Sequence, residues 1–453
     1  KGVSINTRTL EPGEAFVAIK GPRFDGADFL LDAVEKGATG LIVGSDRTAD
    51  ALFAARKAPD RVFVVAVDDT TKALTAMASA WVEVMSPAIL AITGSVGKST
   101  TKDLVAAVCA TRYTVHSTPG NLNNLLGLSL TCLKLLPRHE VLVVEMGTSG
   151  EGEIAQLCRI APPRLGVVTM VDAAHIEGFG SLDGVARAKA ELVAALPPDG
   201  CLVINADDPR VAAMGKGVRA RVWSYGQKGE TDVRIRKAEI GVDGRTGATF
   251  EVGGQTVHAR LQLVGAHQAY NAAAAIAVGA ALGIDPGTCC NAMARVGPGS
   301  HRMHLVGTGA IRVIDDCYNA SPRTVRAALS TLKEMVATGR RVAVLGDMLE
   351  LGSLNDQAHI EVGRWTASMG VDVLIAVGRN ASLMVKAAIK AGIKPSAAFE
   401  APDALAAADV ALAIVEAGDL VLVKGSRGVG LENVVRRLVK DGSTDVESSG
   451  EGN

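Results

Sequence analysis

The sequence predicts an α/β protein of three domains, with parallel sheets in its central and C-terminal parts. The chain has 453 residues, which is too long for one ordinary hydrophobic core. Apolar segments such as "AILAIT" and "VLVVEMG" alternate with amphipathic stretches, a pattern typical of parallel strands covered by helices on both faces. Breaks containing Pro or Gly at 84–88 and 296–301 interrupt this alternation and indicate domain boundaries.

The boundaries divide the chain into segments 1–85, 86–297 and 298–440. The first contains "AFVAIK", "GLIVG" and "VFVVAV" as short strands, with helical stretches such as 28–36. The second contains "AILAIT", "VLVVEMG", "LGVVTMV" and "CLVINAD", and a peripheral antiparallel patch at about 231–263. The third contains "IRVIDD", "RVAVLGD", "VLIAVG" and "DLVLVKG". The remainder, 441–453, is rich in Gly, Ser and acidic residues, and we expect it to be disordered.

Composition and charge narrow the function classes. The net charge of −1 gives no electrostatic reason to expect nucleic acid or an anionic membrane as a partner. The longest apolar stretch, 272–283, is too short and too rich in Ala and Gly to span a bilayer. The seven cysteines include no CxxC pair, so we expect reduced thiols and no zinc site. These features favour a cytoplasmic protein, and we expect a monomer.

The stretch "AITGSVGKSTTK" at 91–102 predicts a phosphate-binding loop between a strand at 88–92 and a helix at 98–109. Glycines allow the backbone N–H groups to point inward, and the helix N-terminus and Lys98 add positive charge. A hydroxyl from Ser99 or Thr100 is placed to ligate Mg²⁺. Ile92 occupies a position that is Gly in the strict pattern, so the match is to the shortened form G-x-x-G-K-S-T. The alternative is a glycine-rich turn with an exposed lysine. The predicted cradle comprises Thr93, Gly94, Ser95, Gly97, Lys98, Ser99 and Thr100.

Two further residues are predicted at the same edge of the sheet, because ligands bind at the carboxyl ends of parallel strands. Glu145 ends the strand "VLVVE", where its carboxylate would suit Mg²⁺; the alternative is an N-cap of the next helix. His175 follows the next strand, and both a role at metal or phosphate and a structural role stay open.

Lys189 stands in the middle of an apolar stripe on the helix predicted at 181–196. The stripe recurs at helical spacing before and after it, at Leu182, Val185, Ala186, Leu192, Val193 and Leu196. Either the side chain extends to solvent at the edge of the stripe, or it is buried and paired or chemically modified.

Polar residues near other strand and loop ends predict a cleft between the second and third segments. "PGNLNNLLG" offers Asn121 and Asn124 in a loop that is either substrate-facing or an ordinary capped turn. Asp315, Asp316 and Asp347 end strands of the third segment, with helix capping as the alternative for each.

These motifs, in this order, resemble those of the Mur ligases. The resemblance covers about residues 4–440 and rests on "TGSVGKST", "GNLNN", "VVEMG", "AHIEGFGSLDGVARAKAEL", "GAHQAYNAAAA", "DDCYNASP", "GDMLELG" and "KGSRG". Within the family, "AHIEGFGSL", "DDCYNASP" and "GDMLELG" are most similar to the branch that adds D-alanyl-D-alanine to UDP-N-acetylmuramoyl-tripeptide in peptidoglycan synthesis.

The resemblance implies a small α/β domain for the UDP end of the substrate, a central P-loop ATPase domain and a C-terminal Rossmann-like domain for the incoming amino compound. It implies ATP and two Mg²⁺ ions, with a carbamylated Lys189 helping to hold the second. It implicates Lys98, Lys189 and His175 in catalysis, and Ser99, Glu145, His175 and Lys189 in binding Mg²⁺. Near the nucleotide it implicates His267, Asn271, Arg302 and Asn319. For the substrate it implicates Thr7, Arg8, Asn121 and Asn124.

Three alternatives remain at this stage. One is a sibling ligase that adds a single amino acid, the third of the peptide. Another is a P-loop protein that binds nucleotide without consuming it. The last is a ligase-like chain without catalysis, which the intact Lys98, Glu145, His175 and Lys189 do not support.

Overall fold

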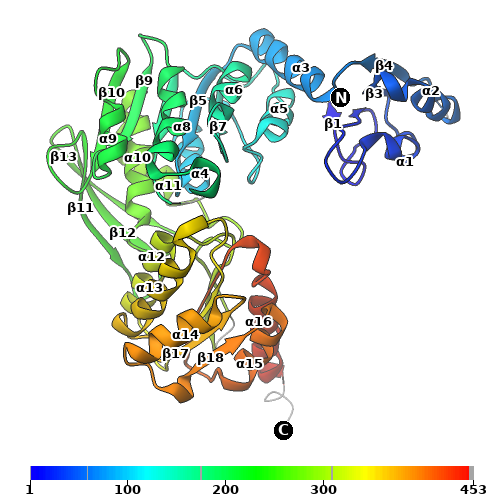
Figure 1. The fold of residues 1–453 in the computed structure, drawn as a ribbon. Helices are drawn as coiled ribbons and strands as arrows, with labels where there is room; N and C mark the ends of the chain where they lie inside the picture. Colours follow the sequence, from blue (N-terminus) through cyan, green and yellow to red (C-terminus); the bar gives the residue numbers. More distant parts are fainter. Residues whose placement is uncertain (1, 59, 174–175, 308–309, 448–453) are drawn as a thin grey trace, which may run out of the picture.

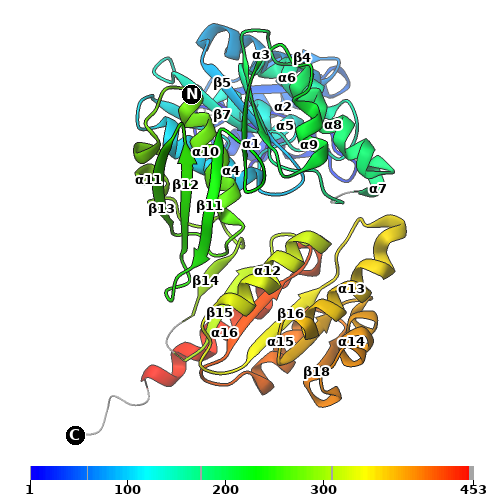
Figure 2. The same ribbon diagram turned by 90° about the vertical axis from the view of Figure 1, so that its left-hand side faces the viewer.

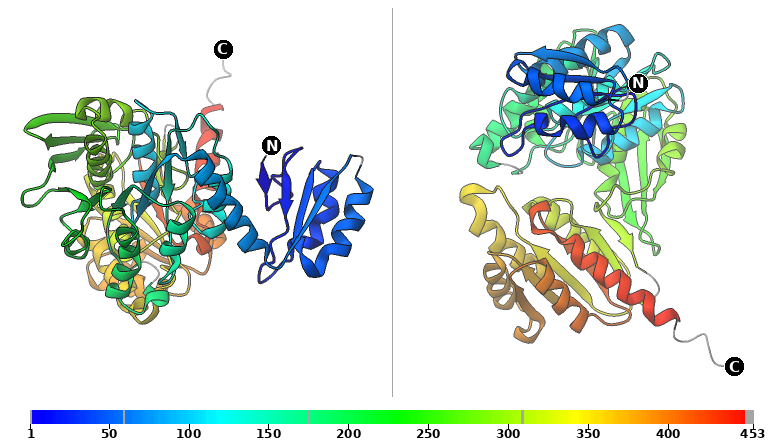
Figure 3. Two further views of the ribbon diagram at one scale, coloured as in Figure 1. Left: turned by 90° about the horizontal axis from the view of Figure 1, so that it is seen from above. Right: turned by 90° about the vertical axis from the view of Figure 1, so that its right-hand side faces the viewer.

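The computed structural model describes residues 2–58, 60–173, 176–307 and 310–447, and their strands form three sheets. Figure 1 shows the first sheet to the side of the other two, joined to them through α3 (Thr70–Met85). Figure 3 shows the same separation from above. Sheet membership changes between Val67 and Ala88, and again between Leu261 and His304.

The first sheet has four parallel strands in the order β1-β2-β3-β4. Its core is built from apolar side chains of β3, the buried "GLIVG", against one face of two helices. Asp69 caps the N-terminus of α3 by accepting a hydrogen bond from the Lys72 N–H. The bounds are β1 (Val3–Ser4), β2 (Ala15–Val17), β3 (Gly40–Gly44), β4 (Phe63–Val67), α1 (Leu30–Glu35) and α2 (Thr48–Lys57).

The second sheet has nine strands in the order β13-β12-β11-β10-β9-β8-β5-β7-β6. The strands from β6 to β11 are parallel to their neighbours, whereas β12 runs antiparallel to both β11 and β13. The predicted antiparallel patch is therefore confirmed, at one edge of this sheet. The strands are β5 (Ala88–Thr93), β6 (Val115–Ser117), β7 (Val141–Glu145), β8 (Leu165–Val168), β9 (Cys201–Asn205), β10 (Arg221–Gly226), β11 (Val233–Ile240), β12 (Thr246–Val252) and β13 (Gln255–Leu261).

Helices cover both faces of this sheet, as its continuous apolar strands predict. Side chains of α4 and the alanine-rich α10 pack on one face, and those of α3, α5, α6 and α8 pack on the other. The helices are α4 (Lys98–Cys109), α5 (Leu125–Leu133), α6 (Glu153–Ile160), α7 (Ile176–Phe179), α8 (Leu182–Ala194), α9 (Pro209–Met214), α10 (Gln268–Ala281) and α11 (Pro286–Met293).

The third sheet has six strands in the order β14-β15-β19-β16-β17-β18, all parallel except β14. Figure 2 shows it below the second sheet, with α12 near the boundary between them. The elements are β14 (His304–Val306), β15 (Arg312–Asp316), β16 (Arg341–Gly346), β17 (Val373–Val377), β18 (Ala398–Ala401), β19 (Leu420–Lys424), α12 (Pro322–Glu334), α13 (Asn355–Ser368), α14 (Ala381–Lys390), α15 (Ala404–Ile414) and α16 (Glu432–Glu447).

The C-terminal helix differs from the sequence prediction. We expected disorder over 441–453, yet α16 continues to Glu447, so 441–447 is helical. Extending an existing helix adds a hydrogen bond per residue without a second nucleation cost, which lets a polar sequence remain helical. Residues 448–453 lie outside the described residues. In the described part of the chain, no helix combines the length and the apolar character that a bilayer crossing requires.

Candidate functional site

The loop between β5 and α4 has the geometry of a phosphate cradle. Gly94 and Gly97 have φ values of +144° and +85°, which favour glycine. A Cβ at Gly94 would lie 1.9 Å from Thr169 Oγ1, and one at Gly97 would lie 2.5 Å from Asn271 Oδ1. The loop closes tightly onto its neighbours only because both positions lack a side chain. Helix α4 begins at Lys98, as predicted, so its N-terminus points into the loop.

Lys98 places its ammonium group on this loop. Its Nζ donates to the carbonyl oxygens of Gly94 at 2.8 Å and Ser95 at 3.3 Å. Burial lowers the pKa of Lys98, the Glu145 carboxylate raises it, and Arg302 lowers it. A desolvated ammonium held beside a helix N-terminus concentrates positive charge where a phosphate would bind.

Glu145 lies at the end of β7 with its carboxylate shared between two neighbours. Ser99 Oγ donates to Oε2 at 2.6 Å, and Asn123 Nδ2 donates to Oε1 at 2.7 Å. The Glu145 backbone N–H donates to Thr118 Oγ1 at 3.1 Å. The carboxylate contacts the first turn of α4 and caps no helix through these contacts, which favours the metal interpretation over the capping one. Ser99 and Glu145 together offer adjacent oxygen atoms of the kind that Mg²⁺ prefers.

Lys189 is buried on the face of α8 that packs against the sheet, with 4% of its surface exposed. This burial excludes the alternative in which the side chain extends to solvent. No hydrogen bond or ion pair to its ammonium is found among the described residues. Burial, with a smaller contribution from Lys98, lowers the pKa of Lys189 to about 7. A substantial fraction of this amine is therefore uncharged at neutral pH.

A single cleft of about 700 Å³ runs from the phosphate loop to the third sheet. Ser321 spans the two sides, since its Oγ donates to Asp172 Oδ2 at 3.0 Å. From the second segment the cleft is lined by Ser95 through Thr100 and by Asn121, Asn123, Glu145, His267 and Asn271; from the third it is lined by Arg302, Asp316, Tyr318, Asn319, Arg323, Lys424 and Arg427.

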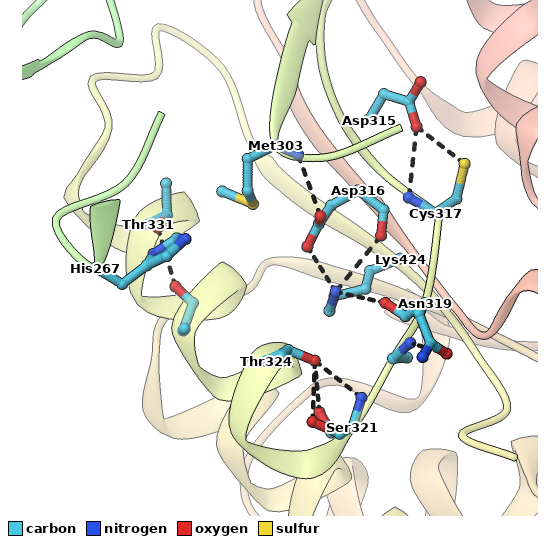
Figure 4. Close-up of polar contacts among 12 residues, drawn as sticks. His267, Met303, Asp315, Asp316, Cys317, Asn319, Ser321, Thr324, Thr331 and Lys424 are labelled. Carbon is cyan, nitrogen blue, oxygen red and sulfur yellow. Dashed lines mark hydrogen bonds and ion pairs between the residues drawn. The ribbon is translucent and has the colours of Figure 1, made fainter. Parts of the chain in front are cut away.

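The wall contributed by the third sheet carries paired charges. Lys424, which ends β19, donates through Nζ to Asp316 Oδ2 at 2.6 Å and to the Asn319 carbonyl at 2.9 Å (Figure 4). The guanidinium of Arg302 stacks on the Tyr318 ring, with 3.8 Å between Cζ and the ring centroid. This wall thus presents a cation and an aromatic ring to the same cleft as the phosphate loop.

The N-terminus of α10 joins the loop to this wall. Asn271 Oδ1 accepts a hydrogen bond from Thr101 Oγ1 at 3.2 Å, and its Nδ2 donates to Gln268 Oε1 at 2.8 Å. His267 stands at the start of the same helix, and burial lowers its pKa, while Asp316 raises it. Both residues lie in the cleft lining, where the motif resemblance placed the nucleotide.

Comparison with known proteins decides the family. Three family models match in chain order: "Mur ligase family, catalytic domain" over residues 1–91, "Mur ligase middle domain" over 92–279 and "Mur ligase, glutamate ligase domain" over 301–427. The UDP-N-acetylmuramoyl-tripeptide–D-alanyl-D-alanine ligase of Bacillus subtilis is 34% identical over 97% of this chain and 93% of its own. The chain belongs to the Mur ligase family.

Solved Mur ligase structures have the same architecture. A crystal structure of MurF from Acinetobacter baumannii superposes with a TM-score of 0.84 at 27% identity, covering 97% of this chain and 93% of that one. MurF from Thermotoga maritima, solved in complex with ADP, gives a TM-score of 0.82 at 28% identity and covers 98% of both chains. The predicted three-part α/β architecture is thereby confirmed.

Some residues predicted for the Mur ligase site lie elsewhere. Thr7 and Arg8, predicted for the UDP end of the substrate, lie in the segment of the first sheet, away from the cleft, and their role stays a prediction. Asn124 caps α5, because its Oδ1 accepts from the Gly127 N–H at 2.9 Å, so its side chain serves the helix instead of the cleft. Asp347 Oδ2 and Oδ1 accept the backbone N–H groups of Arg379 and Asn380, at 2.9 and 3.0 Å, so its carboxylate holds the loop that precedes α14. His175 lies outside the described residues.

Two cleft residues of this Mur ligase were not singled out from the sequence. Asn123 binds Glu145, whereas the sequence prediction named its neighbours Asn121 and Asn124. Lys424 ends "DLVLVK" at the carboxyl edge of the third sheet, which is the signal that identified Asp316. Applying the strand-end rule to every charged residue would have found Lys424. Local sequence contains no equivalent signal for the choice among three nearby asparagines.

Proposed function

We propose that this Mur ligase uses ATP to join D-alanyl-D-alanine to UDP-N-acetylmuramoyl-tripeptide in peptidoglycan precursor synthesis. One observation carries the proposal: a single cleft is lined both by a phosphate loop and by the cationic edge of a second α/β sheet. The Bacillus subtilis relative with the corresponding name matches nearly the whole chain, which supports this branch over the sibling that adds one amino acid. A nucleotide switch would have no use for the second charged wall.

ATP is placed with its phosphates on the loop between β5 and α4. Lys98 and the N-terminal N–H groups of α4 supply positive charge, and Ser95, Gly97 and Thr100 form the rest of the cradle. The Thr93 hydroxyl is buried and donates to the Met146 carbonyl at 2.8 Å, so this residue shapes the loop and leaves phosphate contact to others. The nucleoside then extends toward Asn271 of α10, Arg302 of the linker before β14 and Asn319 of the loop after β15.

Mg²⁺ fits beside the phosphates. The Ser99 hydroxyl and the Glu145 carboxylate lie 2.6 Å apart, and both are hard oxygen donors at the mouth of the loop. Mg²⁺ bound there would neutralise charge on the phosphate oxygens. Asn123 donates to the other carboxylate oxygen of Glu145, which orients the carboxylate toward Ser99, while Thr118 Oγ1 accepts from the Glu145 backbone N–H and holds the end of the strand.

Lys189 is proposed to act as a carbamate. Its neutral amine attacks CO₂, forming an N–C bond and releasing one proton to solvent, so an uncharged buried amine becomes an anion. The depressed pKa of about 7 favours the neutral amine that this reaction requires. The carbamate anion would face the positive charge of Lys98. In the unmodified side chain, the same charge disfavours the ammonium form of Lys189. A carbamate oxygen would also suit a second Mg²⁺.

The reaction brings three anionic groups together, namely the tripeptide carboxylate, the triphosphate of ATP and the carboxylate of the dipeptide. The tripeptide carboxylate attacks the γ-phosphorus of ATP, which gives an acyl phosphate and ADP. The amine of the dipeptide then attacks the acyl carbon, and the amide forms as phosphate leaves. Lys98 holds the transferring phosphoryl group, while the cleft walls align the two substrates and exclude water. The third domain presents Arg323 from α12, Arg427 from a short 3-10 helix and Lys424 from the end of β19 for the carboxylate of the incoming dipeptide.

We also propose a division of labour among domains 1–85, 86–297 and 298–440. The first binds the uridine diphosphate end through Thr7 and Arg8, with Asn121 facing the substrate from the second. Closure of the domains would bring the dipeptide held by the third domain into line with the acyl phosphate. The seven unpaired cysteines fit a reducing compartment such as the cytoplasm, and a monomer suffices because one chain supplies the whole cleft.

The decisive experiment measures phosphate release with ATP, Mg²⁺ and UDP-N-acetylmuramoyl-tripeptide, with and without D-alanyl-D-alanine, and identifies the product by mass. We expect stoichiometric phosphate release that needs the dipeptide and yields a pentapeptide product. Release that needs a single amino acid and a UDP-N-acetylmuramoyl-dipeptide acceptor would assign the chain to the sibling ligase. Nucleotide binding without turnover on either acceptor would leave only the P-loop binding protein.

Substitutions of Asn124 and Asn123 give a matched pair of variants, of which the first tests the helix cap and the second tests the geometry of the site. We expect Asn124→Ala to lower the free energy of unfolding by about 1 kcal/mol, through loss of the α5 cap, with little change in kcat. We expect Asn123→Ala to lower kcat on the order of tenfold, because Glu145 loses an orienting hydrogen bond. Urea unfolding and steady-state kinetics measure both. A stable Asn124→Ala with a raised KM would restore the substrate role for Asn124.

A further inference from the structure

Behind the third-sheet wall of the cleft, three metal-ligating side chains converge. His301 Nδ1 lies 2.8 Å from Asp315 Oδ2, Cys317 Sγ lies 2.9 Å from Asp315 Oδ1, and Cys317 Sγ lies 3.6 Å from His301 Nδ1. Figure 4 shows the thiol of Cys317 and the carboxylate of Asp315 facing each other. Among the described residues, this is the one set of three such groups whose ligand atoms lie within 4.8 Å of one another.

The spacing suits a tetrahedral zinc ion. Zinc lies about 2.3 Å from a thiolate sulfur and about 2.0 Å from an imidazole nitrogen or a carboxylate oxygen. In a tetrahedron these bonds place sulfur and nitrogen about 3.5 Å apart, and nitrogen and oxygen about 3.3 Å apart. The observed sulfur–nitrogen distance of 3.6 Å already agrees. The carboxylate, at 2.8 Å from nitrogen and 2.9 Å from sulfur, needs to move by about half an ångström.

The backbone holds these groups in place from two separate segments. Asp315 lies in β15 and Cys317 directly follows that strand, and both are buried, with 4% and 2% of their surfaces exposed. His301 comes from the linker between the second and third sheets, where its φ of +57° lies in the left-handed region. The Tyr318 N–H donates to the His301 carbonyl at 3.1 Å and ties the linker to the strand end.

Solvent reaches the cluster from one side. The His301 side chain is 30% exposed, so a hydrated ion can approach past its ring and keep a water molecule in the fourth position. The donor set of one sulfur, one nitrogen and one oxygen selects a borderline-soft cation, since Mg²⁺ requires oxygen ligands. The arrangement does not suit a nucleophilic thiol, because the Asp315 carboxylate beside Cys317 stabilises the protonated form.

We propose that His301, Asp315 and Cys317 form a binding site for Zn²⁺ or a cation of the same class. On binding, the Cys317 thiol proton leaves to solvent, and the His301 ring keeps its proton on Nε2 while Nδ1 faces the metal. The bound ion connects the interdomain linker to the end of β15. Tyr318, Arg302 and Asp316, which are immediate sequence neighbours of the three ligands, line the cleft, so the ion would restrain that wall.

Co²⁺ is the probe that tests the site, because thiolate ligation gives an intense near-ultraviolet charge-transfer band. The full chain is titrated with Co²⁺ in excess Mg²⁺, without nucleotide, and then with Zn²⁺ as competitor. We expect one Co²⁺ per chain with a thiolate band that Zn²⁺ displaces. Ligation at Ser99 and Glu145 would give no such band. The readout does not depend on ligase activity, so it stands apart from the test of the proposed function.

Matched variants assign the ligands. Cys317→Ser should abolish the band, and His301→Asn, which keeps the thiol and tolerates a positive φ, should weaken Co²⁺ binding at least about tenfold. Cys201→Ser is the control, because this partly exposed thiol lies outside the cluster and should leave the band intact. Thermal melts verify that each variant folds. Absence of the band in the unaltered protein, or its persistence in Cys317→Ser, would overturn the proposal.

Discussion

Replacing Lys98 by methionine is expected to lower kcat for phosphate release on the order of 10³-fold or more. The ammonium lies on the phosphate loop, 2.8 Å from the Gly94 carbonyl, and partial desolvation there lowers its pKa. Removing one preorganised charge from such a site costs catalysis far more than removing the same charge from a solvated surface. Steady-state phosphate release with both substrates measures the loss.

Stability separates this loss of activity from misfolding. Burial lowers the pKa of Lys98, so the folded protein carries this charge at a cost, and the isosteric methionine should leave the melting temperature unchanged or higher. Lys72→Met is the control, since Lys72 is exposed on α3. The kcat of this variant should equal that of the unaltered protein. A kcat for Lys98→Met within tenfold of that of the unaltered protein would contradict the placement of the phosphates on this loop.

Replacing Lys189 by methionine is expected to have opposite effects on stability and on turnover. The pKa of Lys189 falls from 10.5 to about 7 on folding, so the unfolded chain binds more protons between these two pH values. In CO₂-depleted buffer, the stability of the unaltered protein should therefore rise with pH across this window. The variant should be more stable by a few kcal/mol at pH 7, and the difference should shrink toward pH 10. Urea unfolding at several pH values measures both trends.

The same substitution should lower kcat at least about 100-fold, because the proposed carbamate and its negative charge are lost. Carbon-13 NMR with labelled bicarbonate should show a carbamate signal that Lys189→Met lacks. Added acetate should partly restore turnover to Lys189→Ala, whose smaller side chain leaves space for a free carboxylate, and should do nothing for the methionine variant. Full activity of either variant without added carboxylate would remove Lys189 from the mechanism.

The local sequence by itself determined the elements that carry the site. Continuous apolar strands between amphipathic helices predicted parallel sheets. A strand followed by a glycine-rich loop and a lysine predicted a phosphate-binding loop with α4 starting at Lys98. Glu145 followed from the rule that strand ends share one edge of a sheet. These inferences succeed because hydrophobic period, glycine freedom and strand direction are properties of short segments.

The tertiary structure decided what depends on partners distant in sequence. Periodicity placed Lys189 in an apolar stripe, but only packing against the sheet showed that it is buried and not at an edge. Among the asparagines of one loop, Asn123 binds Glu145, and Asn124 caps a helix. The linker brings His301 beside Asp315 and Cys317, a convergence that the spacing of the cysteines along the chain does not indicate. The folded backbone sets the direction of each side chain and brings together residues that are distant in sequence. A sequence pattern therefore does not show which partner a given polar group contacts.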